Sequence, residues 1–285
     1  MFVERNAGSL SLFLAVTLAI AVECVPGRAT AEPAGPAPNV PGGMTAGERD
    51  LFEVADEANN PLPTHTQLQF KPSYTFPEGD TRYKAEMLFE PLLPYPAFLI
   101  PDLEVADFWS IARIQLTAES LQNSKGPASG LTDLTLTDLV AHTLGPFDAA
   151  LGFATVFPMA TTPALGQGKW QLGPAAGLRL ESIKQLRIAA LVQNFYSVAG
   201  SNQSPALAYV TVQPFITLHL PTAFFFSSDA PMSFYWKGGQ STVPVNLGFG
   251  RAFGKHFVGS VRGWCTVADA DRGAIKGEVV LNFQP

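Results

Sequence analysis

Hydrophobic and polar residues alternate with a period of two along most of the chain after its first quarter. In residues 274–283, Lys276 and Glu278 fall on one face, whereas Val279 and Leu281 fall on the other. Successive side chains of a β-strand point to opposite faces, so this pattern indicates strands with one polar and one apolar face. Segments of this kind are about as long as the roughly 9–11 residues that a tilted strand needs to cross a membrane.

The alternation, together with the turn residues between segments, predicts twelve strands. Tight connections such as Gly145-Pro146 alternate with longer ones such as residues 118–130 and 230–240. Short turns on one rim and long loops on the other are typical of outer-membrane barrels. The predicted strands cover residues 66–74, 82–93, 108–117, 131–144, 147–157, 169–181, 185–198, 206–219, 222–229, 241–252, 256–267 and 274–284.

We expect these strands to form one closed antiparallel transmembrane β-barrel over residues 65–285, an all-β fold. In hydrocarbon, each unpaired backbone N–H or C=O costs several kcal/mol, so an open sheet edge cannot face lipid. Pairing the first strand with the last removes both edges. The stretch 94–107 departs from the loop pattern, because it is long, Pro-rich and apolar on the rim where turns should be short.

The first residues of the chain have the pattern of an export signal. Residues 10–22 are apolar except for Ser11 and Thr17, a stretch too short to span a bilayer but typical of the core of a signal peptide. Ala31 ends the small-x-small sequence Ala29-Thr30-Ala31, which fits a signal peptidase. We therefore expect residues 1–31 to be a cleaved signal peptide.

Residues 32–64 are expected to be a periplasmic leader. Within it, Thr45-x-x-Glu48 matches a helix capping box. A short amphipathic helix would place one group of apolar residues on a single face, namely Leu51, Val54, Ala55 and Ala58. A leader without a helix is the alternative interpretation.

Composition and charge narrow the range of functions. Only 15% of the residues are charged, against about 25% in a soluble domain, which indicates either a large dry core or a surface that faces lipid. The net charge of −6 argues against a nucleic-acid partner, whose phosphates require a basic surface. The four histidines show no metal-ligand spacing, so we expect no metal and no cofactor.

The charged residues on the polar faces are the candidate functional residues. An Arg or Lys on the lipid face would cost roughly 2–4 kcal/mol at the bilayer midplane, so these side chains should point into the lumen. Both signs of charge occur, which leaves two interpretations: an ion-pair network that braces a narrow barrel, or the lining of a selective aqueous path. The candidates are Lys84, Glu86, Glu90, Arg113, Arg179, Arg187, Gln213, Arg262, Lys276 and Glu278.

Several short motifs resemble, in their order, those of the outer-membrane proteins of the MetA phenol-degradation-pathway family. The resemblance covers roughly residues 58–285 and implies a transporter-like barrel that moves small, often hydrophobic or aromatic compounds; it supplies no catalytic residues. The motifs are Asn60-Pro61-Leu62-Pro63, residues 130–136 (GLTDLTL), Phe157-Pro158, residues 166–174 (GQGKWQLGP), Gln213-Pro214-Phe215 and residues 242–250 (TVPVNLGFG).

The leading hypothesis is a monomeric channel or transporter in the outer membrane, in contact with lipid and with a small-molecule solute, and not an enzyme. One alternative is a structural or ligand-binding barrel with a plugged lumen, and another is a soluble periplasmic carrier with a lipocalin-like barrel. A third is an outer-membrane lipid hydrolase, for which His142 beside Asp138 is the candidate pair, although no Gly-x-Ser-x-Gly motif accompanies it. His219, at a predicted strand end, is expected to be solvated.

Overall fold

A computed structural model describes residues 46–76, 83–97, 108–123, 126–180, 185–268 and 274–285, and the predicted signal peptide lies outside these ranges. The described chain contains one α-helix, a short 3-10 helix η1 (Pro221–Ala223) and fourteen strand segments. They are α2 (Ala46–Ala58), β1 (Gln67–Thr75), β2 (Tyr83–Pro96), β3 (Phe108–Asn123), β4 (Gly126–Leu131), β5 (Leu134–Leu144), β6 (Phe147–Phe157), β7 (Lys169–Leu180), β8 (Leu186–Gly200), β9 (Ala208–His219), β10 (Phe224–Ser228), β11 (Met232–Lys237), β12 (Val243–Ala252), β13 (Phe257–Ala268) and β14 (Ile275–Phe283).

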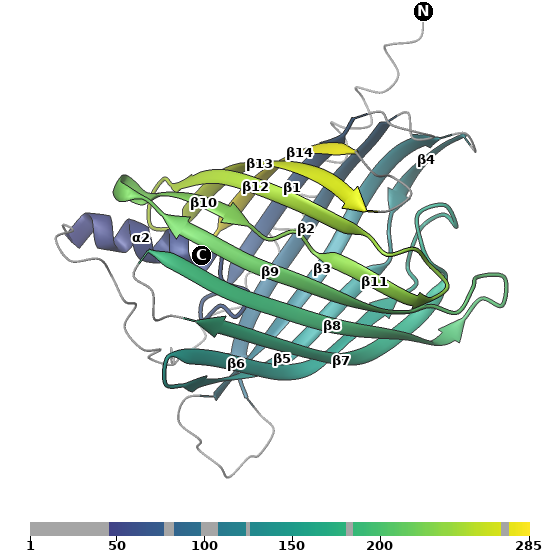
Figure 1. The fold of residues 1–285 in the computed structure, drawn as a ribbon, viewed down its shortest axis with the longest axis horizontal. Helices are drawn as coiled ribbons and strands as arrows, with labels where there is room; N and C mark the ends of the chain where they lie inside the picture. Colours follow the sequence, from purple (N-terminus) through teal and green to yellow (C-terminus); the bar gives the residue numbers. More distant parts are fainter. Residues whose placement is uncertain (1–45, 77–82, 98–107, 124–125, 181–184, 269–273) are drawn as a thin grey trace, which may run out of the picture. The chain divides into compact units, whose positions relative to one another are not determined.

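The strands form a closed antiparallel barrel of twelve wall strands, as predicted (Figure 1). The first strand pairs with the last, with Leu68 opposite Phe283. The count is twelve because β4 and β5 both pair with β3 and act as one wall strand, and β10 and β11 both pair with β9 and act as another. The pairing of β1 with β14 closes the sheet, as a strand fold in lipid requires, and among the described residues a single bridge, from Ser233 to Thr242, joins β11 to β12.

Two predicted loops are wrong. Residues 118–130 are largely strand, because β3 continues to Asn123 and β4 starts at Gly126. Residues 230–240 contain β11. In both places the two arms of a hairpin continue to pair beyond the region where their sequences alternate clearly, so periodicity alone ends the strands too early. Of the ambiguous stretch 94–107, β2 takes in the residues up to Pro96, and residues 98–107 lie outside the described ranges.

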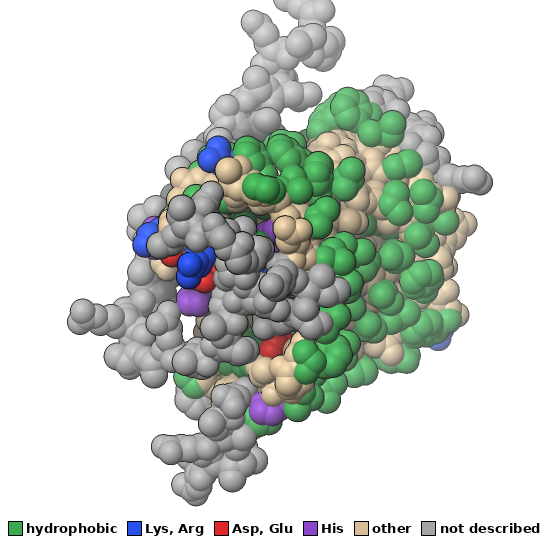
Figure 2. All heavy atoms as spheres, turned by 60° about the vertical axis from the view of Figure 1, so that its left-hand side comes forward, with side chains coloured by type: hydrophobic (Ala, Val, Ile, Leu, Met, Phe, Trp, Pro, Cys, Tyr) green, Lys and Arg blue, Asp and Glu red, His purple; other side chains and the backbone are tan. Residues whose placement is uncertain are grey.

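Apolar side chains face outwards and charged ones face inwards. Leu178, near the end of β7, and Val279, in the middle of β14, are 49% and 40% exposed. Arg179, Arg262 and Glu278 are each 8% exposed. Figure 2 shows hydrophobic side chains spread over the outer wall, with the charged side chains that are visible gathered mainly at the end of the barrel where α2 lies. A soluble protein would have the reverse arrangement, so the outer wall is built for contact with lipid.

Helix α2 packs against the strands at one end of the barrel. Its predicted apolar face is confirmed: Ala55 and Ala58 are buried with Ala223 and Phe225, and Leu51 and Val54 pack against the same cluster. The carbonyl oxygen of Ala58 accepts a hydrogen bond from the side chain of Asn282 in β14. The predicted capping residue Thr45 lies outside the described ranges. No described helix is long and apolar enough to cross a membrane.

Candidate functional site: the barrel interior

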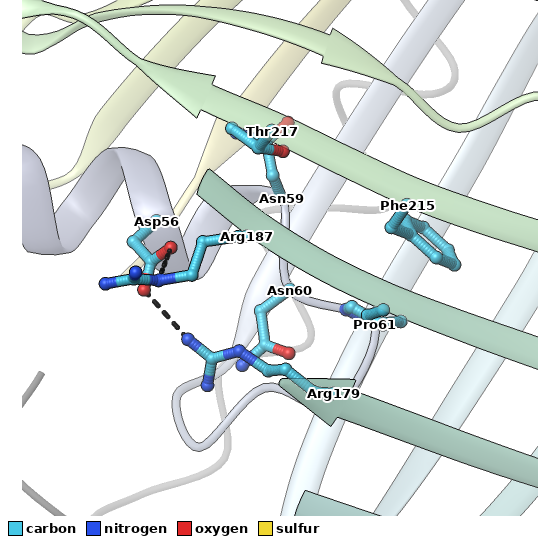
Figure 3. A pocket seen from close by; sticks show the side chains of 9 residues that line it. Asp56, Asn59, Asn60, Pro61, Arg179, Arg187, Phe215 and Thr217 are labelled. Carbon is cyan, nitrogen blue, oxygen red and sulfur yellow. Dashed lines mark hydrogen bonds and ion pairs between the residues drawn. The ribbon is translucent and has the colours of Figure 1, made fainter. Parts of the chain in front are cut away.

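A carboxylate of α2 connects the helix to three strands of the wall. Asp56 forms ion pairs of 2.8 Å with Arg179 in β7 and 2.9 Å with Arg187 in β8, and its Oδ1 lies 3.2 Å from Nε2 of His219 in β9. Figure 3 shows Asp56 between the two guanidinium groups. Arg179 also reaches Asp148 in β6, at 3.5 Å. We call Asp56, Arg179, Arg187 and His219 the latch, because they hold α2 against the wall.

The chain that follows the helix folds back into the barrel. Glu57 organises this turn: its carboxylate accepts hydrogen bonds from the backbone N–H of Thr64 and of His65, and from the side chain of Asn60. Leu62, at the tip of the turn, is fully buried and covers Gly177, where a Cβ atom would lie 2.9 Å from a methyl group of Leu62. Glycine at this position therefore gives the turn the space it occupies.

This segment is closely packed. The pocket between the turn and the strands has a volume of about 10 Å³ and is bounded by Asp56, Asn60, Pro61, Arg187 and Phe215, among others. Figure 3 shows these side chains converging from the helix, the turn and β7–β9. A water molecule needs roughly 10–15 Å³ of such space, so the gap between the turn and these strands holds about one water molecule at most.

The surroundings of Asp56 and Glu57, two of the acidic residues of α2, lower the pKa of both carboxylates. Burial by itself raises the pKa of Asp56, but the hydrogen bond with His219 and the charges of Arg179 and Arg187 outweigh burial and lower the pKa to about 2. Burial also raises the pKa of Glu57, and its hydrogen bonds with His65, the charge of Arg179 and the bond from Asn60 bring the net pKa below the usual value. Both carboxylates are therefore ionised at physiological pH.

A network of ion pairs lines the interior of β1, β2 and β3. Glu90 is 1% exposed and lies between Lys71, 2.7 Å away, and Arg113, whose Nε donates to it. Both terminal nitrogens of Arg113 donate to Oε1 of Gln213, at 3.1 Å, across to β9. Gln213 in turn donates to the backbone oxygen of Asp229, at 2.8 Å. These contacts join opposite walls of the barrel.

The network continues on β13 and β14. Arg262 pairs with Asp229 at 2.7 Å and with Glu278 at 3.5 Å. Lys276 lies 3.9 Å from both Glu278 and Glu86. We call the connected set the ionic ladder; it consists of Lys71, Lys84, Glu86, Glu90, Arg113, Glu119, Gln213, Asp229, Arg262, Lys276 and Glu278.

The ten predicted residues thus fall into two groups. Arg179 and Arg187 belong to the latch, and the other eight belong to the ionic ladder. Sequence reasoning missed Lys71, although it shares the polar face of its strand with Gln67 and Gln69. It also missed Asp56, which no pattern within a strand could indicate because it comes from a helix. The expectation that His219 is solvated is wrong: it is 3% exposed, because α2 covers the end of β9.

The opposite side of the interior is apolar. A cluster of buried side chains runs from the α2 end, with Leu62 and Trp109, to the far end, with Leu207 and Tyr209. Rings are stacked at the far end: Phe195 lies 5.0 Å from Tyr209, and Tyr209 lies 4.6 Å from Tyr235. We call this cluster the apolar stripe; it comprises Leu62, Trp109, Ile111, Leu139, Ala141, Ala150, Ala154, Val156, Ala175, Leu191, Phe195, Leu207 and Tyr209.

The candidate hydrolase pair lies on the other face of the wall. On β5, Thr137, Leu139 and Ala141 point inwards and are buried, which puts Asp138 and His142 on the outer face. Asp138 accepts a hydrogen bond of 2.6 Å from the hydroxyl of Tyr95, and the ring of His142 stacks on Phe108 at 4.1 Å. These contacts give Asp138 and His142 partners other than a nucleophilic serine. Among the described residues, no group of three His, Cys, Asp or Glu side chains could hold a metal ion.

Comparison with known proteins supports the architecture. No family model matches the sequence, and no curated protein does. Among solved structures, an outer membrane channel from Pseudomonas putida F1 superposes with a TM-score of 0.58 at 10% identity, over 78% of this chain and 96% of that one. NanC porin gives a TM-score of 0.53 at 9% identity, over 76% and 100%. The chain therefore has the barrel fold of outer-membrane channels and porins, and its apolar outer wall is suited to the outer membrane.

Proposed function

We propose that the protein is a monomeric outer-membrane channel for small uncharged solutes, above all hydrophobic or aromatic ones. The observation that carries this proposal is the apolar stripe, whose buried side chains extend along the interior from the α2 end to the far end of the wall. An interior of this kind offers an apolar solute contacts that bulk water does not, and each buried methylene is worth about 0.8 kcal/mol. The resemblance to the MetA family supports the same class of solute.

The ionic ladder supports the preference for uncharged solutes. Its acids and bases face one another at distances of 2.7 to 3.9 Å, so their fields largely cancel at the centre of the lumen. A passing ion would have to lose water and gain little in return. In this proposal the predicted lumen residues brace the barrel and restrict its width, and the apolar stripe provides the path.

The segment from Phe52 to Thr64 makes a second function worth testing, that of a ligand-binding barrel with a plugged lumen. The observation in its favour is the close packing of Leu62 and the latch inside one end of the barrel. For a channel, this segment must move at least part of the time. Weakening the latch should then increase flux, whereas a binding barrel would remain closed to solutes.

The test compares two neutral sugars that differ in one aromatic group, phenyl β-glucoside and methyl β-glucoside, in a liposome-swelling assay with refolded protein. We expect faster entry of the phenyl compound, and a loss of this preference in Phe195→Ser, which interrupts the stacked rings of the apolar stripe. Leu151→Ser is the matched control: Leu151 lies on the outer face and is 70% exposed, so this variant should retain the preference.

The same assay separates the two functions. Asp56→Asn removes the charge at the centre of the latch and should increase the entry of both sugars. If neither sugar enters through the unmodified protein or through Asp56→Asn, the channel proposal is wrong and the binding barrel remains. Entry without any preference for the phenyl compound would keep the channel but remove the proposed solute class.

A further inference from the structure

One arginine of the wall points outwards instead of into the lumen. The residue after it in β12, Ala252, is 1% exposed and packs with α2, so the alternation of the strand puts Arg251 on the outer face. Phe224 of β10 lies directly opposite Arg251, and Phe249, two residues earlier on the same face, is 42% exposed. A charge among apolar side chains on this face is unfavourable unless an anion or water meets it.

Arg251 lies close to the rim of the barrel where α2 packs (Figure 1). Strand β12 ends at Ala252, and residues 253–256 form a short connection to β13. The two-residue connection between β5 and β6 belongs to the same rim. Short connections mark the periplasmic side of an outer-membrane barrel, so the long side chain of Arg251 reaches the headgroups of the periplasmic leaflet.

The guanidinium group of Arg251 has no acid beside it. The inward-facing arginines of the latch and the ionic ladder all pair with carboxylates. Within the described part of the chain, Arg251 forms neither an ion pair nor a hydrogen bond, and its buried Nε is without a partner. Its Cζ lies 4.8 Å from the centre of the Phe224 ring, which holds the group in place. Buried polar groups are rarely left unpaired, so Arg251 is available to an anion from outside the chain.

An apolar groove of about 390 Å³ continues from Arg251 toward the middle of the membrane. Its walls are the outward-pointing side chains of Phe226, Leu247, Phe249 and Val261. The ring of Phe249 stacks on that of Phe224 at 5.4 Å, so the groove begins at the ring that supports the guanidinium group. A strand rises about 3.3 Å per residue, so Leu247, four residues from Arg251, puts the far part of the groove about 13 Å from the charge.

A glycine gives the groove its depth. Gly263 lies opposite Leu247, and nothing lies within 4 Å of the position that its Cβ atom would take. An empty groove would lose dispersion contacts on both of its walls, so a flexible hydrocarbon chain is the natural occupant of such a depression in a wall that faces lipid. A cation at the rim and an apolar groove deeper in the membrane follow the order of a phospholipid, headgroup first and acyl chain second.

We propose that Arg251 and the groove form a binding site for one anionic glycerophospholipid of the periplasmic leaflet. The phosphate of the lipid accepts hydrogen bonds from the guanidinium group, whose planar donors match phosphate oxygens. One acyl chain lies in the groove, over Gly263 and between Phe249 and Val261. The site is on the outer wall and does not depend on the proposed channel function.

The headgroup is tested by native mass spectrometry of the refolded protein, with equal amounts of dioleoyl phosphatidylglycerol and dioleoyl phosphatidylcholine. We expect the first bound lipid to be the anionic one about five times as often, the ratio that about 1 kcal/mol of charge attraction gives. Arg251→Gln should bring the ratio to about one, because it removes the charge. Lys255→Gln is the matched control: Lys255 is a cation at the same rim, 73% exposed and paired with Asp50, so the ratio should not change.

The groove is tested with two phosphatidylglycerols that differ only in their chains, dioleoyl and dihexanoyl. The unmodified protein should prefer the dioleoyl lipid. Gly263→Leu fills the groove, so this variant should lose the preference for long chains and keep the preference for the anionic headgroup. Gly277→Leu is the control, because the Cβ position of Gly277 is equally open but does not line the groove.

Three results would overturn the lipid site. An unchanged headgroup preference in Arg251→Gln would remove Arg251 from it, and an equal loss in Lys255→Gln would mean that charge anywhere on the rim attracts anionic lipid. Displacement of the bound dioleoyl lipid by an equal concentration of inorganic phosphate would show that the guanidinium group binds phosphate without help from the groove. Separate losses, of headgroup preference in Arg251→Gln and of chain preference in Gly263→Leu, would support the site as proposed.

Discussion

At the scale of single residues, the interior is governed by buried charges that need partners. Asp56 is 5% exposed and meets two guanidinium groups and an imidazole from three strands. A pair of this kind contributes little net stability compared with apolar residues of the same size, but removal of one partner leaves a buried charge uncompensated. The latch therefore fixes where α2 lies more than how stable the barrel is.

Replacement of Asp56 by Asn should lower the free energy of unfolding by about 3 kcal/mol, because Arg187 loses the carboxylate that faces it. Urea unfolding in detergent micelles measures this change. Asp50→Asn on the same helix is the control: Asp50 is about half exposed and pairs with the exposed Lys255, so a loss below about 1 kcal/mol is expected. Equal losses in the two variants would contradict the role of the latch.

The pH dependence of the same residue follows from its lowered pKa. The pKa of Asp56 is about 2 in the folded protein, against 3.8 for a free side chain, so its contribution to stability is fully present above about pH 4. This contribution, about 2 kcal/mol, is lost as the pH falls through 2. The difference in unfolding free energy between the unmodified protein and Asp56→Asn should be constant from pH 7 to pH 4 and shrink below pH 3. A difference that already shrinks at pH 5 would show that another group controls the latch.

At the scale of elements, the two faces of each strand meet different solvents. Val279, in the middle of β14, and Leu144, at the end of β5, are both exposed to the outside, at 40% and 55%. The cost of a charge on this face depends on its depth in the bilayer. The strand patterns therefore determine not only which face is apolar but also where along a strand a charge is tolerated.

Val279→Arg should destabilise the barrel in lipid vesicles by roughly 2–4 kcal/mol, because the charge lies near the bilayer midplane, whereas Leu144→Arg should cost about 1 kcal/mol or less near the interface. Reversible unfolding in vesicles measures both. Val279→Thr controls for the lost apolar contacts of the side chain. Equal costs for the two arginine variants would mean that this wall does not face lipid.

At the scale of the whole molecule, the interior is divided into an ionic side and an apolar side. Glu90 is the central acid of the ionic ladder, and Lys71 and Arg113 both depend on it. Because the charges of the ladder largely cancel, the loss of one acid leaves a net positive charge at that point of the lumen. The channel proposal therefore makes a prediction about ion selectivity as well as about stability.

Glu90→Gln should shift the reversal potential in a KCl gradient toward that of chloride, because two cations in the lumen lose their shared anion. Planar-bilayer recording measures this shift. Glu53→Gln is the control, because Glu53 lies on the exposed side of α2. A reversal potential that does not change in Glu90→Gln would indicate that ions do not pass this part of the interior.

The amino-acid sequence by itself determined the barrel. The alternation along strands such as residues 274–283 sets which face of each strand is apolar. Because the membrane interior contains no water, every backbone N–H and C=O must be paired within the protein, which requires the sheet to close. The twelve wall strands follow from these two arguments. The same alternation identified eight residues of the ionic ladder. The helical spacing of apolar residues also predicted the apolar face of α2, on which Ala55 and Ala58 are buried.

Only the tertiary structure decided which groups meet across the interior. Asp56 and Arg187 are brought together because the chain after α2 folds back into the lumen, and Arg113 of β3 reaches Gln213 of β9 because closure places these two strands on facing walls. These contacts join residues that belong to different elements, and a periodic pattern describes each element separately. Their positions depend on the closure and shear of the whole barrel, which no local segment of the chain encodes.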